Sequence, residues 1–217
     1  VSAPPVGQSQ VVLSDLGGTV KKIVRSVSGD VLVILESGKV ICCDESWQRR
    51  WESQVAGPVH DADADAERLY LGHAATGLTA LSLTDGSELW HEELERIVSS
   101  CAWWEWFSCA ALCVVAAGPQ SGFTGVVVGC GDMHVRAYEP DGALRWKFRY
   151  VNGIPGVIDL MDVNGDGVDE LLVSGEVMSN RAWCRVVKAD GSLMQELEVE
   201  WWTSRMTAQA LSEDQGQ

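Results

Sequence analysis

The sequence predicts an all-β protein, either a β-propeller or a partial propeller, of about four four-stranded antiparallel blades. Two observations predict this class. Strand-like stretches alternate with turn residues along most of the chain, and one turn-plus-tryptophan pattern recurs. Helix-period stretches are nearly absent, and residues 203–211 are the one modest candidate. A two-sheet sandwich is the alternative, but the repeated register favours the propeller, in which radial repetition protects the sheet edges.

The first elements are strands at residues 19–26 and 30–36, which a Ser-Gly-Asp turn separates. A second turn at Ser37-Gly38 leads to a third strand-like segment at residues 39–44. A further turn precedes Trp51. This order of strand and turn then returns three times along the chain.

The recurring pattern places a Trp four residues after the second position of a turn. Asp-Gly steps suit two-residue hairpins because both residues tolerate positive φ. Successive copies lie 39, 56 and 49 residues apart, from 51 to 90, 146 and 195, near the ~40–50 residues of a four-stranded blade. The four copies are Ser46-Trp47 with Trp51, Asp85-Gly86 with Trp90, Asp141-Gly142 with Trp146, and Asp190-Gly191 with Gln195 in place of Trp.

These spacings predict one repeat domain over residues 1–217. Its blades are expected at about 19–54, 55–94, 106–150 and 154–200, with an insertion at about 95–118. The insertion contains Trp103, Trp104 and Trp106, which suit a loop, an interaction surface or a cover for the core. Its apolar run over residues 107–117 is shorter than the ~20 residues of a transmembrane helix. A buried inner strand is therefore the favoured interpretation, with a membrane span as the alternative.

Composition excludes some functions. A formal charge of −15 and a pI near 4.5 argue against a nucleic-acid partner, because phosphate backbones need a basic patch. Seven cysteines, an odd number, indicate buried free thiols more than a secreted disulfide framework. The chain shows no secretory signal and begins on Val, which indicates a processed form or a piece of something longer. The four His are scattered and no phosphate-binding glycine loop is present, so no catalytic residues are predicted.

One acidic stretch has the spacing of a calcium loop. Hard oxygen donors recur at positions one, three, five and nine, a main-chain carbonyl falls at seven, and Gly167 allows the tight turn. An EF-hand is excluded because position twelve is Val173 and both flanks are strand-like. The remaining alternative is an acidic hairpin turn without a metal. The predicted Ca²⁺ ligands are Asp162, Asn164, Asp166, Glu170 and the carbonyl of Val168.

A second acidic run, with Asp61, Asp63 and Asp65, is placed where blade 2 should make the same turn. Ala66 stands in place of the turn glycine, and Leu69 in place of the ninth-position acid. Ala resists the positive φ that Gly accepts. A solvated surface turn is therefore favoured there, and a second metal loop is the alternative.

Two stretches resemble known repeat families. Residues 80–90, from Ala80 to Trp90, resemble the pyrroloquinoline-quinone-type propeller repeat, although Ser82 and Asp85 replace its acidic residue and its Thr. That resemblance implies the fold more than a function, because such repeats occur in quinone-dependent dehydrogenases and in outer-membrane assembly scaffolds. Residues 158–173 resemble the FG-GAP, integrin-type repeat, whose loop between the first two strands of a blade holds calcium. The Phe-Gly and Gly-Ala-Pro elements of that family are absent here.

The sequence thus predicts a non-enzymatic, calcium-stabilised propeller that acts as an interaction or adhesion-type module with a protein partner. The alternatives are a fragment of a quinone-dependent oxidoreductase and an outer-membrane-assembly-type scaffold. The FG-GAP resemblance implies an extracellular or cell-surface location, against which the odd cysteine count argues.

Overall fold

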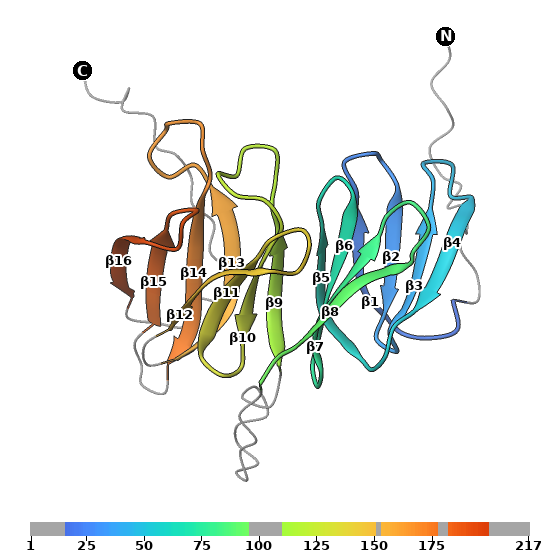
Figure 1. The fold of residues 1–217 in the computed structure, drawn as a ribbon, viewed down its shortest axis with the longest axis horizontal. Coiled ribbons are helices and arrows are strands. Elements are labelled where there is room, and N and C mark those ends of the chain that lie inside the picture. Colours follow the sequence, from blue (N-terminus) through green and yellow to red (C-terminus); the bar gives the residue numbers. More distant parts are fainter. Residues whose placement is uncertain (1–15, 96–109, 151–152, 178–181, 200–217) are drawn as a thin grey trace, which may run out of the picture.

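The structure is a computed structural model that describes residues 16–95, 110–150, 153–177 and 182–199. In these ranges the chain forms four four-stranded antiparallel sheets, each made of consecutive strands (Figure 1). This arrangement confirms the predicted all-β fold class. Blade 1 contains β1 (Val20–Arg25), β2 (Val31–Leu35), β3 (Lys39–Cys43) and β4 (Arg49–Gln54); blade 2 contains β5 (Val59–Ala64), β6 (Arg68–His73), β7 (Gly77–Ser82) and β8 (Glu88–Glu93). Blade 3 contains β9 (Ala111–Ala116), β10 (Val126–Cys130), β11 (His134–Tyr138) and β12 (Leu144–Arg149); blade 4 contains β13 (Gly153–Met161), β14 (Glu170–Val177), β15 (Ala182–Val187) and β16 (Leu193–Val199).

Burial changes across each blade, and the sequence pattern follows it. The second strands β2, β6 and β10 are buried along almost their whole length, which explains their continuous apolar sequences. The fourth strands β4 and β12 instead alternate exposed with half-buried residues. This alternation indicates that the outer strand of a blade packs through one face.

The apolar run at residues 107–117 contains β9, which is buried at nearly every position. This part of the run is therefore an inner strand, as the favoured interpretation predicted. Among the described residues, no helix is long and apolar enough to cross a membrane. Residues 96–109, which hold most of the predicted insertion and its tryptophans, lie outside the described ranges.

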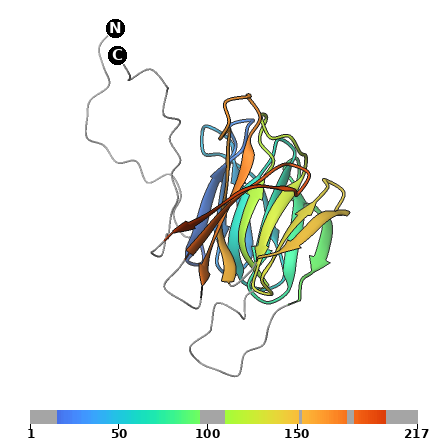
Figure 2. The same cartoon turned by 90° about the vertical axis from the view of Figure 1, so that its left-hand side faces the viewer.

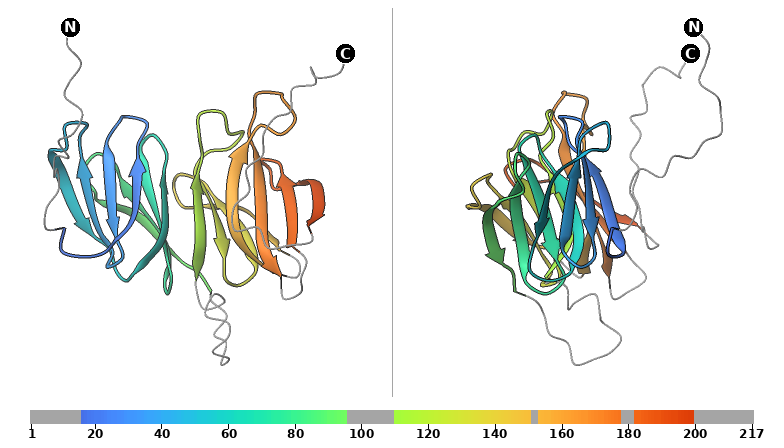
Figure 3. Two further views of the ribbon diagram at one scale, coloured as in Figure 1. Left: turned by 180° about the vertical axis from the view of Figure 1, so that it is seen from behind. Right: turned by 90° about the vertical axis from the view of Figure 1, so that its right-hand side faces the viewer.

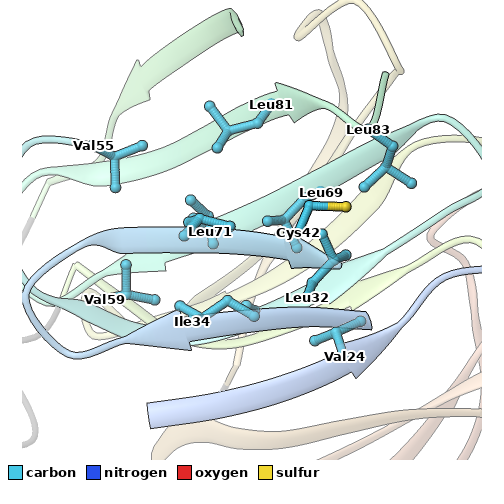
Figure 4. Packing of buried hydrophobic residues seen from close by; sticks show 12 residues of the cluster. Val24, Leu32, Ile34, Cys42, Val55, Val59, Leu69, Leu71, Leu81 and Leu83 are labelled. Atoms are coloured by element: carbon cyan, nitrogen blue, oxygen red, sulfur yellow. The ribbon is translucent and has the colours of Figure 1, made fainter. Parts of the chain in front are cut away.

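The four blades stand in a row with their faces packed together (Figures 1 and 3), and they overlap when seen along the row (Figure 2). The first strands of successive blades are neighbours, because β1 contacts β5, β5 contacts β9, and β9 contacts β13. A separate hydrophobic cluster fills each of the three junctions. Figure 4 shows the cluster between blades 1 and 2, where Leu32 and Cys42 face Leu69 and Leu81. Blades 1 and 4 lie at opposite ends of the row (Figure 1).

The repeated tryptophans join neighbouring blades. The indole Nε1 of Trp51 donates to the Leu83 carbonyl of blade 2 at 2.9 Å. Trp90 donates in the same way to Pro140 of blade 3, and Trp146 to Ala189 of blade 4, each at 2.9 Å. Each indole also lies against the turn glycine of the next blade. A Cβ added to Gly86, Gly142 or Gly191 would lie 2.5, 3.0 or 2.8 Å from the nearest ring carbon.

Each turn glycine is therefore required for two reasons. Its φ is positive, at 74° for Gly86, 90° for Gly142 and 84° for Gly191, a conformation that costs other residues ~1–2 kcal/mol. Its missing side chain also leaves room for the ring of the preceding blade. The sequence pattern predicted the Trp as an apolar anchor, and the structure shows that the anchor acts between blades rather than within one.

Candidate functional site

The first and third turns of every blade lie at one end of the sheets, the upper end in Figure 1, and we call this end the loop face. An up-and-down four-stranded sheet places these two turns together, while the second turn lies at the opposite end. The loop face contains the predicted calcium loop, the three indole-to-carbonyl contacts and the two grooves described below. Its turns are residues 26–30, 44–48, 65–67, 83–87, 117–125, 139–143, 162–169 and 188–192.

The predicted calcium loop joins β13 to β14, the first two strands of blade 4. Main-chain amides hold its first acid. Asp162 Oδ1 accepts hydrogen bonds from the nitrogens of Gly165 and Asp166 at 2.6 and 3.1 Å, and its Oδ2 accepts one from Gly167 at 2.8 Å. The positive φ of Gly165 (80°) and Gly167 (85°) curls the main chain around that carboxylate.

The side chains of the other predicted ligands meet at Asn164. Its Nδ2 donates to Asp166 Oδ2 and to Glu170 Oε1, both at 3.0 Å. Glu170 is buried, and its Oε2 accepts a hydrogen bond from the Val163 nitrogen at 2.9 Å. The loop thus brings the predicted side chains together, with a neutral amide group between the two carboxylates. Val168, whose carbonyl is the fifth predicted ligand, has an exposed side chain at the edge of the loop.

The donors of this loop are the hard oxygens that calcium prefers. Among the described residues, however, no three His, Cys, Asp or Glu side chains are arranged to hold a metal ion. The Asn164 amide makes the contacts between Asp166 and Glu170 that a cation would otherwise make. A Ca²⁺ ion would have to displace that amide donor. The donor chemistry therefore fits the ion, and calcium stays a prediction.

Blade 3 supports the same loop. The Asp169 nitrogen donates to the Gln120 carbonyl at 3.1 Å, and Ser121 and Asp169 form an isolated parallel β-bridge. A Cβ added to Gly122 would lie 3.0 Å from Val168 Cγ1, so the two loops are in close contact. The acidic loop is thus part of the junction between blades 3 and 4 on the loop face.

The second acidic run is not the turn that the sequence predicted for blade 2. Asp61 and Asp63 lie in strand β5, paired with Gly72 and Tyr70 of β6, because Ala62 and Ala64 accept the extended conformation. Asp61 receives Lys22 Nζ at 2.7 Å and the Val114 nitrogen at 2.9 Å, while Asp63 receives the Ala116 nitrogen at 2.8 Å.

Asp65 begins the short turn that follows, where it accepts hydrogen bonds from Tyr70 and from the nitrogens of Glu67 and Arg68. The three carboxylates therefore have different partners and do not converge on one point. Two of them cover main-chain amides along β9, the first strand of blade 3. This arrangement protects a strand edge inside the junction between blades 2 and 3.

Two grooves open on the loop face between neighbouring blades. The first, of about 500 Å³, lies between blades 1 and 2. On one wall Arg50 donates to Asp30 at 2.5 Å, and on the other Arg68 pairs with Glu67 at 3.1 Å. The second groove, of about 280 Å³, lies between blades 2 and 3, and Val27, Phe123 and Pro140 give it apolar walls. Arg68 lines both grooves, which are therefore adjacent.

The histidines and thiols of the described residues are structural. His73 is buried and bonded to Thr79 at 2.8 Å, and burial together with neighbouring His91 lowers its pKa to about 4. His73 is therefore neutral near pH 7. Burial raises the pKa of the Cys42 thiol to about 11. The free cysteines of the described ranges, Cys42, Cys43, Cys113, Cys130 and Cys184, are all buried as predicted, and Cys101 and Cys109 lie outside those ranges.

The four-bladed row and its indole-on-glycine junctions define a repeat protein of the propeller class. A family model described as "Outer membrane protein assembly factor BamB", built on PQQ-type repeats, matches residues 6–150. The chain belongs to this family. No curated protein matches the sequence significantly. The FG-GAP resemblance lies at residues 158–173, outside the matched range, and none of these comparisons supports it.

Solved structures agree on the fold. The chain is similar to BamB from Moraxella catarrhalis, with 15% identity and a TM-score of 0.56 over 82% of this chain and 53% of that one. It is also similar to the Cps50 (Swd1) β-propeller domain of Myceliophteria thermophila, with 16% identity and a TM-score of 0.55 over 77% and 52%. A third similar structure is BBS1N in complex with ARL6DN, with 17% identity and a TM-score of 0.57 over 85% and 57%. The chain therefore spans little more than half the length of each.

Proposed function

We propose that this chain is a non-enzymatic protein-binding scaffold of the outer-membrane-assembly type and that its loop face carries the binding surface. The family match over residues 6–150 is the observation that carries the proposal. It favours the scaffold over the adhesion-type module, because the adhesion interpretation depended on the FG-GAP resemblance. A quinone-dependent enzyme is the alternative.

The loop face suits a protein partner in shape and charge. Its two adjacent grooves, of about 500 and 280 Å³, accept side chains rather than a large cofactor. Asp85, Asp141 and Asp190 are exposed on three neighbouring hairpins, and each accepts a hydrogen bond from an amide of its own turn. A partner segment with Lys or Arg beside an apolar side chain would complement this surface.

Site-specific photocrosslinking in cells tests this proposal. A crosslinker is placed at Thr84, which is exposed in the first groove, and a control crosslinker at Ser37, which is exposed in a turn at the opposite end. The expected result is a defined crosslink from position 84 to a membrane-protein assembly component and none from position 37. Equal crosslinking at both positions, or pyrroloquinoline quinone bound with dehydrogenase activity, would overturn the proposal.

We also propose that calcium binds the blade 4 loop as a structural ion through Asp162, Asn164, Asp166, Glu170 and the Val168 carbonyl. The oxygen-rich ligand spacing and the convergence of Asp166 and Glu170 on Asn164 support this. At about 100 times its dissociation constant, one ion would add roughly 2.7 kcal/mol to the free energy of unfolding.

Thermal unfolding with calcium and with a chelator measures that gain. At roughly 2–4 °C per kcal/mol for a chain of this size, the melting temperature should rise by ~5–10 °C. Asp166→Ala should abolish the rise, whereas Asp85→Ala, in an ordinary hairpin turn, should keep it. An unchanged melting temperature of the intact protein would refute the calcium site.

A further inference from the structure

Each internal junction has a donor side and a receiving side. The donor is a Trp on the fourth strand of one blade, and the receiver is a glycine turn on the next. In the donor register, Trp51 pairs with Cys42, Trp90 with Ala80 and Trp146 with Ala137. In blade 4 the residue in this register is Gln195, paired with Val186. Blade 4 therefore has no tryptophan to offer to a further blade.

Blade 1 shows the reverse exchange at its receiving turn. Trp47 lies four residues before Trp51, as Gly142 does before Trp146. Its φ is +61°, and its nitrogen donates to the carbonyl three residues earlier at 2.9 Å, as the nitrogens of Gly142 and Gly191 do. A Trp with positive φ is uncommon and strained, which marks this turn as more than a connection.

The direction of the Trp47 side chain follows from the glycine turns. At each of them an added Cβ would point into the ring that arrives from the preceding blade, within 3.0 Å for Gly142. The Trp47 side chain therefore projects toward the place that an arriving indole would take. A blade that carried a docking Trp would collide with it, whereas a blade with Gln195 in that register leaves the space free. The receiving turn of blade 1 fits the donor strand of blade 4.

Both end faces also expose apolar side chains. On blade 1, Ile23 pairs with buried Val33 and is 58% exposed. On blade 4, Leu197 lies on the same side of β16 as Gln195 and is 48% exposed. The residue in the place of Leu197 in blade 3 is Phe148, which packs in the cluster between blades 3 and 4. Exposed Lys21 and Arg25 on β1, and Asp159 on β13, add opposite charges to the two ends.

We propose that blade 4 of one copy docks on blade 1 of a second copy, with Trp47 filling the space beside Gln195, so that two chains form one ring. Each matched propeller chain is nearly twice as long as the part that this chain covers, at 52–57%. Two copies therefore have the size of one such propeller. A head-to-tail contact closes into a ring when its rotation allows. This inference does not depend on the proposed partner protein.

Sedimentation velocity and light scattering over a wide concentration series test it. The intact chain should form a dimer of about 47 kDa, twice 23.5 kDa. Ile23→Glu and Leu197→Glu should each weaken the dimer roughly tenfold or more, because each buries a charge at one end. Leu144→Glu, at an exposed leucine of blade 3, should leave it unchanged. Circular dichroism and thermal unfolding establish that each variant is folded.

Mixing the two weakened variants distinguishes a head-to-tail contact from a symmetric one. One partner keeps an intact blade 4 and the other an intact blade 1, so the mixture should recover a dimer with one good junction. In a symmetric blade 1 to blade 1 contact, Leu197→Glu alone would still dimerise, and that result would overturn the proposal. A monomeric intact chain at every concentration would also overturn it.

An exchange of the two key residues supplies the most specific test. Gln195→Trp should prevent the dimer, because the new indole collides with Trp47. The double variant Gln195→Trp/Trp47→Gly should restore it through the junction seen between internal blades. Dimerisation that Gln195→Trp leaves unaffected would contradict the proposed geometry.

Discussion

At the junction of blades 2 and 3, the Trp90 ring lies on Gly142, whereas at the ends of the row the same turn carries Trp47 and the same strand position carries Gln195. The hairpin main chain is alike in both cases, with positive φ and an amide that bonds three residues back. The difference shows that the arriving ring, and not the turn alone, requires glycine. Where no described blade arrives, the turn carries a large side chain despite the strained backbone.

The largest effect is expected from the donor side of a junction. Trp90→Ala removes a half-buried ring and the hydrogen bond to Pro140, and it should lower the free energy of unfolding by about 3 kcal/mol. Gln195→Ala, at the same register of blade 4, should change it by less than about 0.5 kcal/mol. Chemical denaturation measures both. Equal losses would mean that the Trp register does not hold the blades together.

The receiving side should give the next largest effect. Gly142→Ala adds a Cβ 3.0 Å from the Trp90 ring in a turn with φ of 90°, and it should cost about 2–3 kcal/mol. Gly57→Ala is the matched control, because Gly57 also has positive φ, at 81°, but no atom lies within 4 Å of an added Cβ. Its cost should be only the backbone strain of ~1–2 kcal/mol. The difference between the two variants isolates the contact with the ring.

The end of the row should respond in a different way. Trp47→Gly and Trp47→Ala both remove the indole, but only Ala keeps a Cβ at a φ of 61°. The Gly variant should therefore be more stable than the Ala variant by about 1 kcal/mol. This order is the opposite of the usual one, in which Gly loses more conformational entropy on folding. If Ala is the more stable variant, the left-handed turn does not form at Trp47.

A smaller, pH-dependent effect separates the tryptophan contact of the second junction from its acidic one. Burial raises the pKa of Asp63 above its ordinary 3.8, although the Ala116 amide bonds it. The folded state then binds a proton at higher pH than the unfolded state, so stability rises as pH falls through the raised pKa. Asp63→Asn keeps an acceptor without the charge, so it should match or exceed the wild type at pH 7. That advantage should shrink in acid, and an advantage that grows as pH falls would refute the assignment.

The residues that repeat locally made the fold predictable from the sequence. Asp-Gly turns four residues before Trp90 and Trp146 marked the hairpins and the blade length. The receiver of each ring was not predictable, because the bond from Trp90 to Pro140 spans 50 residues. Trp47 was recognised only as a turn residue. Its position four residues before Trp51, the place of glycine in the other copies, was the signal that would have identified it.

The two acidic stretches show a second limit of spacing. Alternate carboxylates occur in both, but Gly165 and Gly167 bend one into a loop, while Ala62 and Ala64 leave the other extended. The partners of Asp61 and Asp63 are the amides of Val114 and Ala116, each 53 residues away. A local pattern therefore predicted the loop of blade 4 correctly and misplaced the acidic strand of blade 2.

A double-mutant cycle between Trp90 and Gly142 tests most directly whether the indole-on-glycine contact joins the blades. Denaturation of the wild type, Trp90→Ala, Gly142→Ala and the double variant gives the coupling free energy. In the Trp90→Ala background, the cost of Gly142→Ala should fall to that of Gly57→Ala, because only the backbone strain remains. Additive costs, with Gly142→Ala equally damaging in both backgrounds, would contradict the contact.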